Sequence, residues 1–216
     1  MKKREHLRLF NFPDSQLATL AREKVAFIRR DSEAFLNYGL TEADFAALEN
    51  AVNDFENLET DVEALYTQTE ATADKEAKAE ELRVAIRGVM TRVAFKYNQN
   101  SATYRKFGTE AFAQQSDAEL LLIAKRVARA AEGLPDLALH GVTTNMLTNI
   151  NMLKDELEEL YIEMKMKMGD REIKQENRIK AANAIYIDLI RYANAGRNIW
   201  ETSDVAKYND YIVYED

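Results

Sequence analysis

The side chains best suited to metal or acid–base chemistry are sparse in this sequence. It has two histidines, His6 and His140, and no cysteine. Neither histidine follows a glutamate at the three-residue spacing with which helical bundles hold two metal ions. The absence of cysteine excludes disulfides, iron–sulfur clusters, thiolate zinc sites and a cysteine nucleophile.

Carboxylates and phosphate-binding loops offer no better candidate. We interpret the acidic run Glu156, Glu158, Glu159 and Glu163 as the solvated face of a helix. The sequence contains no Gly-x-x-x-x-Gly-Lys-Ser/Thr, Gly-x-Gly-x-x-Gly or Gly-x-Ser-x-Gly motif. We therefore assign no catalytic residue, no metal ligand and no cofactor, and nothing in the sequence requires an enzyme.

One polar residue interrupts an apolar stripe. Asp188 falls between Ile185 and Tyr192, with Arg191 three residues further on. An unpaired buried carboxylate is costly, so we favour a boundary residue in a local ion pair. The alternative is a polar anchor in a pocket between helices, with Tyr192 and Trp200 as its walls.

Tyrosines gather at the carboxyl end. Tyr208, Tyr211 and Tyr214 belong to an aromatic tail that covers about residues 205–216 and shows no helical periodicity. Such a tail can pack back on the helices or dock on a partner, and we favour packing back.

Basic residues concentrate on two short amphipathic segments. Lys125, Arg126 and Arg129 lie on the polar side of one, and the other carries a comparable set, Arg22, Lys24, Arg29 and Arg30. A pair of basic helices could contact RNA or anionic lipid. However, the net charge of −8 and the lack of interleaved aromatic residues argue against nucleic acid as a partner.

The elements that position these residues are helices. Only seven glycines and two prolines occur in 216 residues, too few for the turns of a strand-rich fold. Apolar residues recur every three or four positions in four segments: Phe45 to Leu65, Leu82 to Tyr97, Leu147 to Met168, and Ile179 to Trp200. We predict an all-α, up-down four-helix bundle of two helical hairpins, with turns at Thr67–Lys75 and at Gly169-Asp170.

The two hairpins resemble each other. A shift of about 102 residues places Gly39-Leu40-Thr41 on Gly141-Val142-Thr143, and a shorter helix precedes each hairpin, starting after Pro13 and at Ser116. We predict a single domain over residues 1–216 with pseudo-repeats at about 10–102 and 112–204.

These observations leave three hypotheses for function. No segment reaches the length of a membrane span, and the residues after Met1–His6 do not fit a signal peptide, so we expect a cytoplasmic protein without a membrane partner. The first hypothesis is a non-enzymatic scaffold or protein-interaction module whose partner is another protein or itself, as in a homodimer. The second is a small-molecule-binding protein or enzyme with a pocket near Asp188. The third is a nucleic-acid accessory protein that uses the basic short helices.

Overall fold

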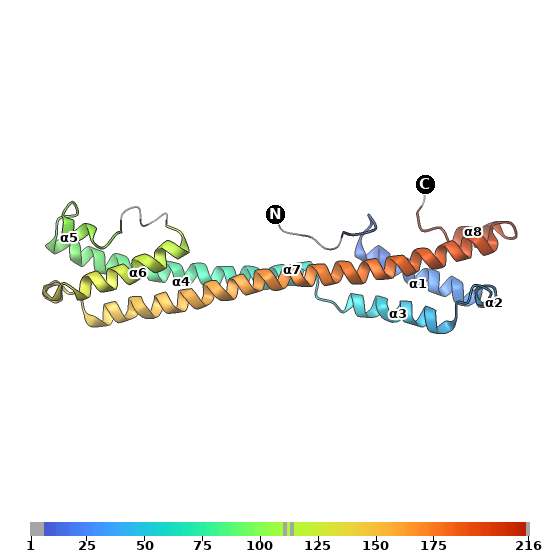
Figure 1. Cartoon of the computed structure of the whole chain (residues 1–216), viewed down its shortest axis with the longest axis horizontal. Helices are drawn as coiled ribbons and strands as arrows, with labels where there is room; N and C mark the ends of the chain where they lie inside the picture. Colours follow the sequence, from blue (N-terminus) through green and yellow to red (C-terminus); the bar gives the residue numbers. More distant parts are fainter. Residues whose placement is uncertain (1–6, 110–111, 113–114, 215–216) are drawn as a thin grey trace. The chain divides into compact units, whose positions relative to one another are not determined.

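The computed structural model describes residues 7–109, 112 and 115–214, so His6 and the last two residues of the aromatic tail lie outside it. The predicted all-α class is confirmed, because helices make up 80% of the described residues and no strand occurs among them (Figure 1). The elements are α1 (Asp14–Arg30), α2 (Ser32–Leu36), α3 (Glu42–Glu56), α4 (Asp61–Lys96), α5 (Ala102–Arg105), α6 (Asp117–Glu132), the 3-10 helix η2 (Pro135–His140), α7 (Thr144–Trp200) and α8 (Val205–Asp210).

The chain divides into two compact units. Unit 1 comprises Met1–Ala64 and Glu172–Asp216, and unit 2 comprises Leu65–Arg171. The division falls within α4 and within α7, so both helices contribute residues to both units.

Unit 1 is built around α1, α3 and the second part of α7. Its core cluster takes the apolar stripe of each of these helices, represented by the fully buried Leu17, Val52 and Leu189. Phe35 of α2 and Tyr211, which follows α8, complete the cluster. Packing these stripes against one another stabilises the three helices, because no single helix can bury its apolar face alone.

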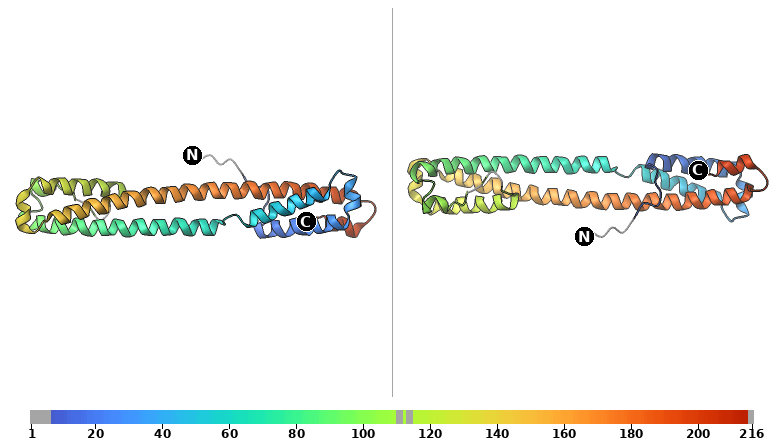
Figure 2. Two further views of the ribbon diagram at one scale, coloured as in Figure 1. Left: turned by 90° about the horizontal axis from the view of Figure 1, so that it is seen from below. Right: turned by 90° about the horizontal axis from the view of Figure 1, so that it is seen from above.

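Unit 2 is built around α4, α6 and the first part of α7 (Figure 2). Its core cluster includes Ile86 of α4, Val127 of α6 and Leu157 of α7, all fully buried. Phe107, just after α5, is also fully buried. The buried apolar residues thus form two clusters, and the structure does not confirm a four-helix bundle.

Local capping chemistry starts the shorter helices where the sequence predicts. Ser116 and Glu119 form the predicted capping box, since the Ser116 amide donates to Glu119 Oε2 at 2.9 Å and the Glu119 amide to Ser116 Oγ at 3.4 Å. Thr41 caps α3, with its amide 2.8 Å from Asp44 Oδ2. Gly141 has φ +80°, a conformation that glycine adopts without strain, directly before α7.

Both predicted hairpin turns are wrong. The segment Thr67–Lys75 lies inside α4, because it contains no glycine or proline and its alanines, glutamate and lysine favour helix. Gly169 and Asp170 lie inside α7, where an exposed glycine costs only about 1 kcal/mol and does not end a long helix.

The first break falls instead at residues 57–60. There the Thr60 amide and hydroxyl both donate to Glu63 Oε2 at 2.7 Å and start α4. Because of this break, Val62 and Leu65 do not continue the buried stripe of α3 and are 76% and 42% exposed.

The aromatic tail is partly helical, contrary to the prediction of a non-helical tail. Asp204 Oδ1 accepts a hydrogen bond from the Lys207 amide at 3.1 Å and thereby caps α8. A helix of six residues is too short to show a period in the sequence.

Candidate functional site

The three residues predicted to form a pocket lie in different surroundings. Tyr192 is buried, and its hydroxyl accepts from Arg191 at 2.9 Å and donates to the Asp44 carbonyl at 3.4 Å. Burial raises the pKa of Tyr192. The Asp188 side chain is 40% exposed and pairs with Arg191 at 3.2 Å.

Trp200 packs against the core cluster of unit 1 and not against Asp188. The Lys207 ammonium lies 4.1 Å from the centre of its ring. Its indole nitrogen is buried, with no hydrogen-bond partner among the residues described. The groove described below is lined by other residues. The structure therefore does not bring Asp188, Tyr192 and Trp200 together around a common pocket.

The tail tyrosines contact unit 1, to which they belong. Arg197 donates to the Tyr208 hydroxyl at 2.9 Å, and the hydroxyls of Tyr186 and Tyr214 are 2.8 Å apart. Burial and this hydrogen bond raise the pKa of Tyr214 to about 12. Tyr211 is fully buried, with its ring against the backbone of Gly196.

A buried carboxylate anchors this tail. The Asp31 side chain is 1% exposed and accepts from Lys207 Nζ at 2.7 Å, from the Tyr211 hydroxyl at 2.9 Å and from Arg30 at 2.7 Å. Burial alone would raise the pKa of Asp31, but these hydrogen bonds lower it to about 2. Sequence reasoning missed Asp31, because two of its partners lie 176 and 180 residues away along the chain.

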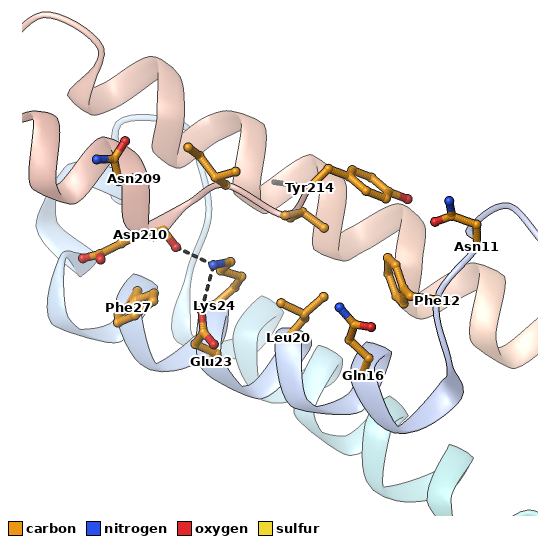
Figure 3. Close-up of a pocket in the computed structure, with 12 residues that line it drawn as sticks. Asn11, Phe12, Gln16, Leu20, Glu23, Lys24, Phe27, Asn209, Asp210 and Tyr214 are labelled. Atoms are coloured by element: carbon orange, nitrogen blue, oxygen red, sulfur yellow. Dashed lines mark hydrogen bonds and ion pairs between the residues drawn. The ribbon is translucent and has the colours of Figure 1, made fainter. Parts of the chain in front are cut away.

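The tail also borders a groove of about 670 Å³ on α1 (Figure 3). Phe12, Leu20 and Phe27 provide apolar walls, and Asn11 and Gln16 provide amides. The groove is also lined by Lys24, which is only 3% exposed and donates to the Asp210 carbonyl at 2.6 Å and to Glu23 at 2.8 Å. The expectation that Lys24 lies on the polar side of its helix is therefore wrong.

The basic residues of α1 are neutralised within unit 1. Arg22 pairs with Glu56 through two hydrogen bonds, at 2.5 and 2.7 Å. Arg29 pairs with Glu42 at 2.7 Å and with Glu49 at 2.9 Å. These guanidinium groups are committed to internal ion pairs and do not form a free basic surface.

The basic residues of α6 are different. They share an exposed face with an apolar residue that is 63% exposed, and we call this face the basic stripe: Leu122, Lys125, Arg126 and Arg129. Within the part of the chain that the structure describes, none of its three cations has an ion pair within 4.0 Å. Arg129 donates only to the backbone carbonyl of Lys125, at 3.3 Å.

An oppositely charged face lies on α7 of the same unit. Helical spacing aligns its exposed residues opposite the buried Leu157, and we call them the acidic stripe: Met152, Asp155, Glu158, Glu159, Ile162, Glu163 and Met166. Met152, Ile162 and Met166 are 55%, 54% and 63% exposed. Asp155 pairs with Lys154 at 2.5 Å, whereas Glu158, Glu159 and Glu163 have no ion pair with any described residue.

The described residues include no group of three or more histidines, aspartates and glutamates placed to hold a metal ion. None of the described helices combines the length and apolarity needed to cross a membrane. No protein-family model, curated protein or solved structure matches the chain.

Proposed function

We propose that this chain is a non-enzymatic scaffold whose unit 2 binds a protein partner through the basic and acidic stripes. The observation that carries the proposal is the exposure of large apolar side chains in line with unpaired charges on α7. Ile162 and Met166 are both more than half exposed and one turn apart.

Scattered exposed apolar residues are ordinary, but an aligned set is not. On α7, the buried stripe around Leu157 already accounts for the packing of unit 2, so the opposite face has no role in its core. Apolar residues interleaved with charges are typical of a helix face that binds another helix, with the charges selecting the partner.

The lack of native cysteine permits a direct test. Ile162→Cys, labelled with a photo-reactive maleimide, is irradiated in an extract of the cells that produce the protein. We expect a discrete protein adduct, identified by mass spectrometry. Ile187→Cys is the matched control, because Ile187 is 56% exposed on the same helix but lies outside the stripe. Equal adducts at both positions, or none at Ile162→Cys, would overturn the proposal.

A second candidate function, small-molecule binding, is favoured by the groove beside Lys24. A buried ammonium that lines a partly apolar groove is suited to the carboxylate of an apolar ligand, which would replace the exposed Glu23 as its partner. Medium-chain carboxylates should then raise the midpoint of thermal unfolding of the wild-type chain and not of Lys24→Met. No shift in the wild type would reject this function.

We also infer that the units derive from a tandem duplication with pseudo-repeats at about 10–102 and 112–204. Support comes from buried residues of α4 and α7 that recur 103 positions apart: Ala79 and Ala182, Leu82 and Ile185, Ile86 and Leu189, Val89 and Tyr192, Met90 and Ala193.

Ion pairs recur at the same spacing. Lys75 contacts Asp117 at 2.6 Å, and Arg178 contacts Asp14 at 2.9 Å. Unit 1 would then take α1 and α3 from the first repeat and the second part of α7 from the second repeat. Unit 2 would take α4 from the first repeat, and α6 and the first part of α7 from the second. Equivalent pairs should respond alike, so Lys75→Met and Arg178→Met should each destabilise its own unit by about 1–3 kcal/mol. Hydrogen exchange of α6 and α1 measures this, and protection lost in one unit alone would contradict the equivalence.

A further inference from the structure

We propose that one end of unit 2 binds the surface of an anionic phospholipid bilayer. Figures 1 and 2 show that the end of α4, α5, η2 and the start of α7 meet at this end of the unit, which we call the tip. The inference goes beyond the scaffold function and does not depend on it, because the acidic stripe takes no part. The expectation of no membrane partner rested on the lack of a spanning segment, and a peripheral contact does not need one.

Two apolar side chains project from the tip. Leu139 of η2 and Phe95 of α4 are 88% and 80% exposed, more than any other large apolar residue that the structure describes. Leu137 and Val93, two positions earlier in each case, are buried in the core cluster of unit 2. The core therefore fixes the backbone on which the two exposed side chains stand.

Polar contacts between α4 and η2 place Phe95 and Leu139 beside the same ion pair. Lys96, next to Phe95, pairs with Asp136, and the Tyr97 hydroxyl lies 3.5 Å from the same carboxylate. Side chains three residues apart share one side of a 3-10 helix, so Leu139 lies on the Asp136 side of η2.

Positive charge surrounds these apolar residues. Residues 82–109 and 120–131 contain nine lysines and arginines and no acid, although the chain as a whole has a net charge of −8. Three of the nine form ion pairs, since Arg83 and Arg87 both contact Glu80 and Lys96 contacts Asp136. Five have no ion pair with any residue that the structure describes: Arg92, Lys106, Lys125, Arg126 and Arg129.

Two of these unpaired cations extend the positive surface to the tip itself. Arg92 lies one turn before Phe95, packs against Gly141 at the start of α7, and donates only to the Gly88 carbonyl, at 2.8 Å. Lys106 follows α5 and is exposed. The cations of the basic stripe continue this surface along α6.

The combination of protruding carbon and unpaired cations favours a bilayer over a nucleic acid. Lysine and arginine are attracted to anionic headgroups, and apolar side chains gain by entering the boundary between headgroups and acyl chains. A nucleic acid would use the same cations and could stack a base on Phe95, but it offers Leu139 no comparable site. Only the bilayer uses both exposed apolar residues.

A probe at Leu139 tests insertion, because the chain has no native cysteine. The full-length Leu139→Cys chain is labelled with nitrobenzoxadiazole, a dye whose fluorescence rises in an apolar environment. We expect at least a twofold rise with vesicles of phosphatidylcholine and phosphatidylglycerol, and quenching by lipids that carry a nitroxide on the acyl chain. Vesicles of phosphatidylcholine alone should leave the fluorescence unchanged. Val205→Cys is the matched control and should show neither effect, because Val205 is 74% exposed but lies on α8 of unit 1.

Cosedimentation with the same vesicles separates the apolar and charged contributions. Phe95→Ser combined with Leu139→Ser should weaken binding at least fivefold, and so should Lys106→Glu in an otherwise wild-type chain. Because the cations are at the surface, raising the salt concentration from about 50 to 500 mM should release the wild type.

Two control variants make the same chemical changes in unit 1. Val62→Ser combined with Val205→Ser removes apolar side chains that are 76% and 74% exposed. Lys180→Glu reverses one exposed charge on α7. Both should bind the vesicles within twofold of the wild type.

Three results would overturn the proposal. The first is a wild type that binds neither kind of vesicle, and the second is equal quenching of the probes at residues 139 and 205. The third is vesicle binding that the tip variants weaken no more than the controls do. If the wild type binds a single-stranded RNA but no vesicle, and Lys106→Glu abolishes that binding, the cations serve a nucleic acid and the bilayer is rejected.

Discussion

Replacement of Asp31 by asparagine should loosen the carboxyl-terminal tail by an amount that depends on pH. The carboxylate of Asp31, which directly follows α1, is almost fully buried. It binds Lys207 and Tyr211 of the tail and so attaches the tail to the end of α1. Asparagine keeps the shape but loses the charge, so the cationic partners face a neutral group.

The magnitude follows from proton linkage. The pKa of Asp31 falls from its ordinary value of 3.8 to about 2 in the folded chain. At about 1.4 kcal/mol per pH unit, the ionised carboxylate contributes about 2–3 kcal/mol to the stability of unit 1. Because the folded pKa is lowered, this contribution is complete above about pH 5, falls to about half near pH 3 and is lost below pH 2.

The single tryptophan, Trp200, lies in unit 1 and reports its unfolding without a label. Urea titrations followed by tryptophan fluorescence should place the free energy of unfolding of Asp31→Asn about 2–3 kcal/mol below that of the wild type at pH 7. The two curves should approach each other as the pH falls to 2.5. Asp188→Asn is the matched control, since its exposed ion pair with Arg191 should contribute less than about 1 kcal/mol. A difference for Asp31→Asn that stays constant from pH 7 to 2.5, or equals that of the control, refutes the reasoning.

Three further substitutions test the packing and the helix ends. Gly196→Ala places a methyl 2.3 Å from the Tyr211 ring, so unit 1 should lose about 1–3 kcal/mol in the same fluorescence titration; an unchanged midpoint would contradict the close approach. Gly169→Ala meets no atom within 4 Å and should raise helix stability by about 0.5–1 kcal/mol in thermal melts followed by circular dichroism; destabilisation would contradict a continuous α7. Ser116→Ala removes the capping box with Glu119 and should lower the stability of α6 by about 1 kcal/mol, measured as faster amide exchange in its first turn. Unchanged exchange rates would contradict a stabilising cap.

Helix starts and apolar stripes could be predicted from the sequence because their causes are local. A serine with a glutamate three residues later satisfies the free amides of a helix end wherever that helix packs, which is why the start of α6 at Ser116 was predictable. The same chemistry at Thr60 and Glu63 is visible in the sequence and would have placed the first break correctly.

The candidate sites could be predicted only in part. The sequence pattern predicted a basic face at Lys125, Arg126 and Arg129, but it predicted the same kind of face for the basic residues of α1. Arg22 and Arg29 differ from them only because α3 supplies carboxylates, and that depends on how the helices pack.

The amino-acid sequence by itself determined that the chain is helical, that it carries no thiol or phosphate-loop chemistry, and which face of each helix is apolar. These properties follow from side-chain type and a period of 3.6 residues. Only the tertiary structure decided that α7 continues through Gly169, that Lys24 and Asp31 are buried, and which charges remain unpaired. Those outcomes depend on contacts between residues up to 186 positions apart, such as Lys24 with Asp210, and no local pattern encodes them.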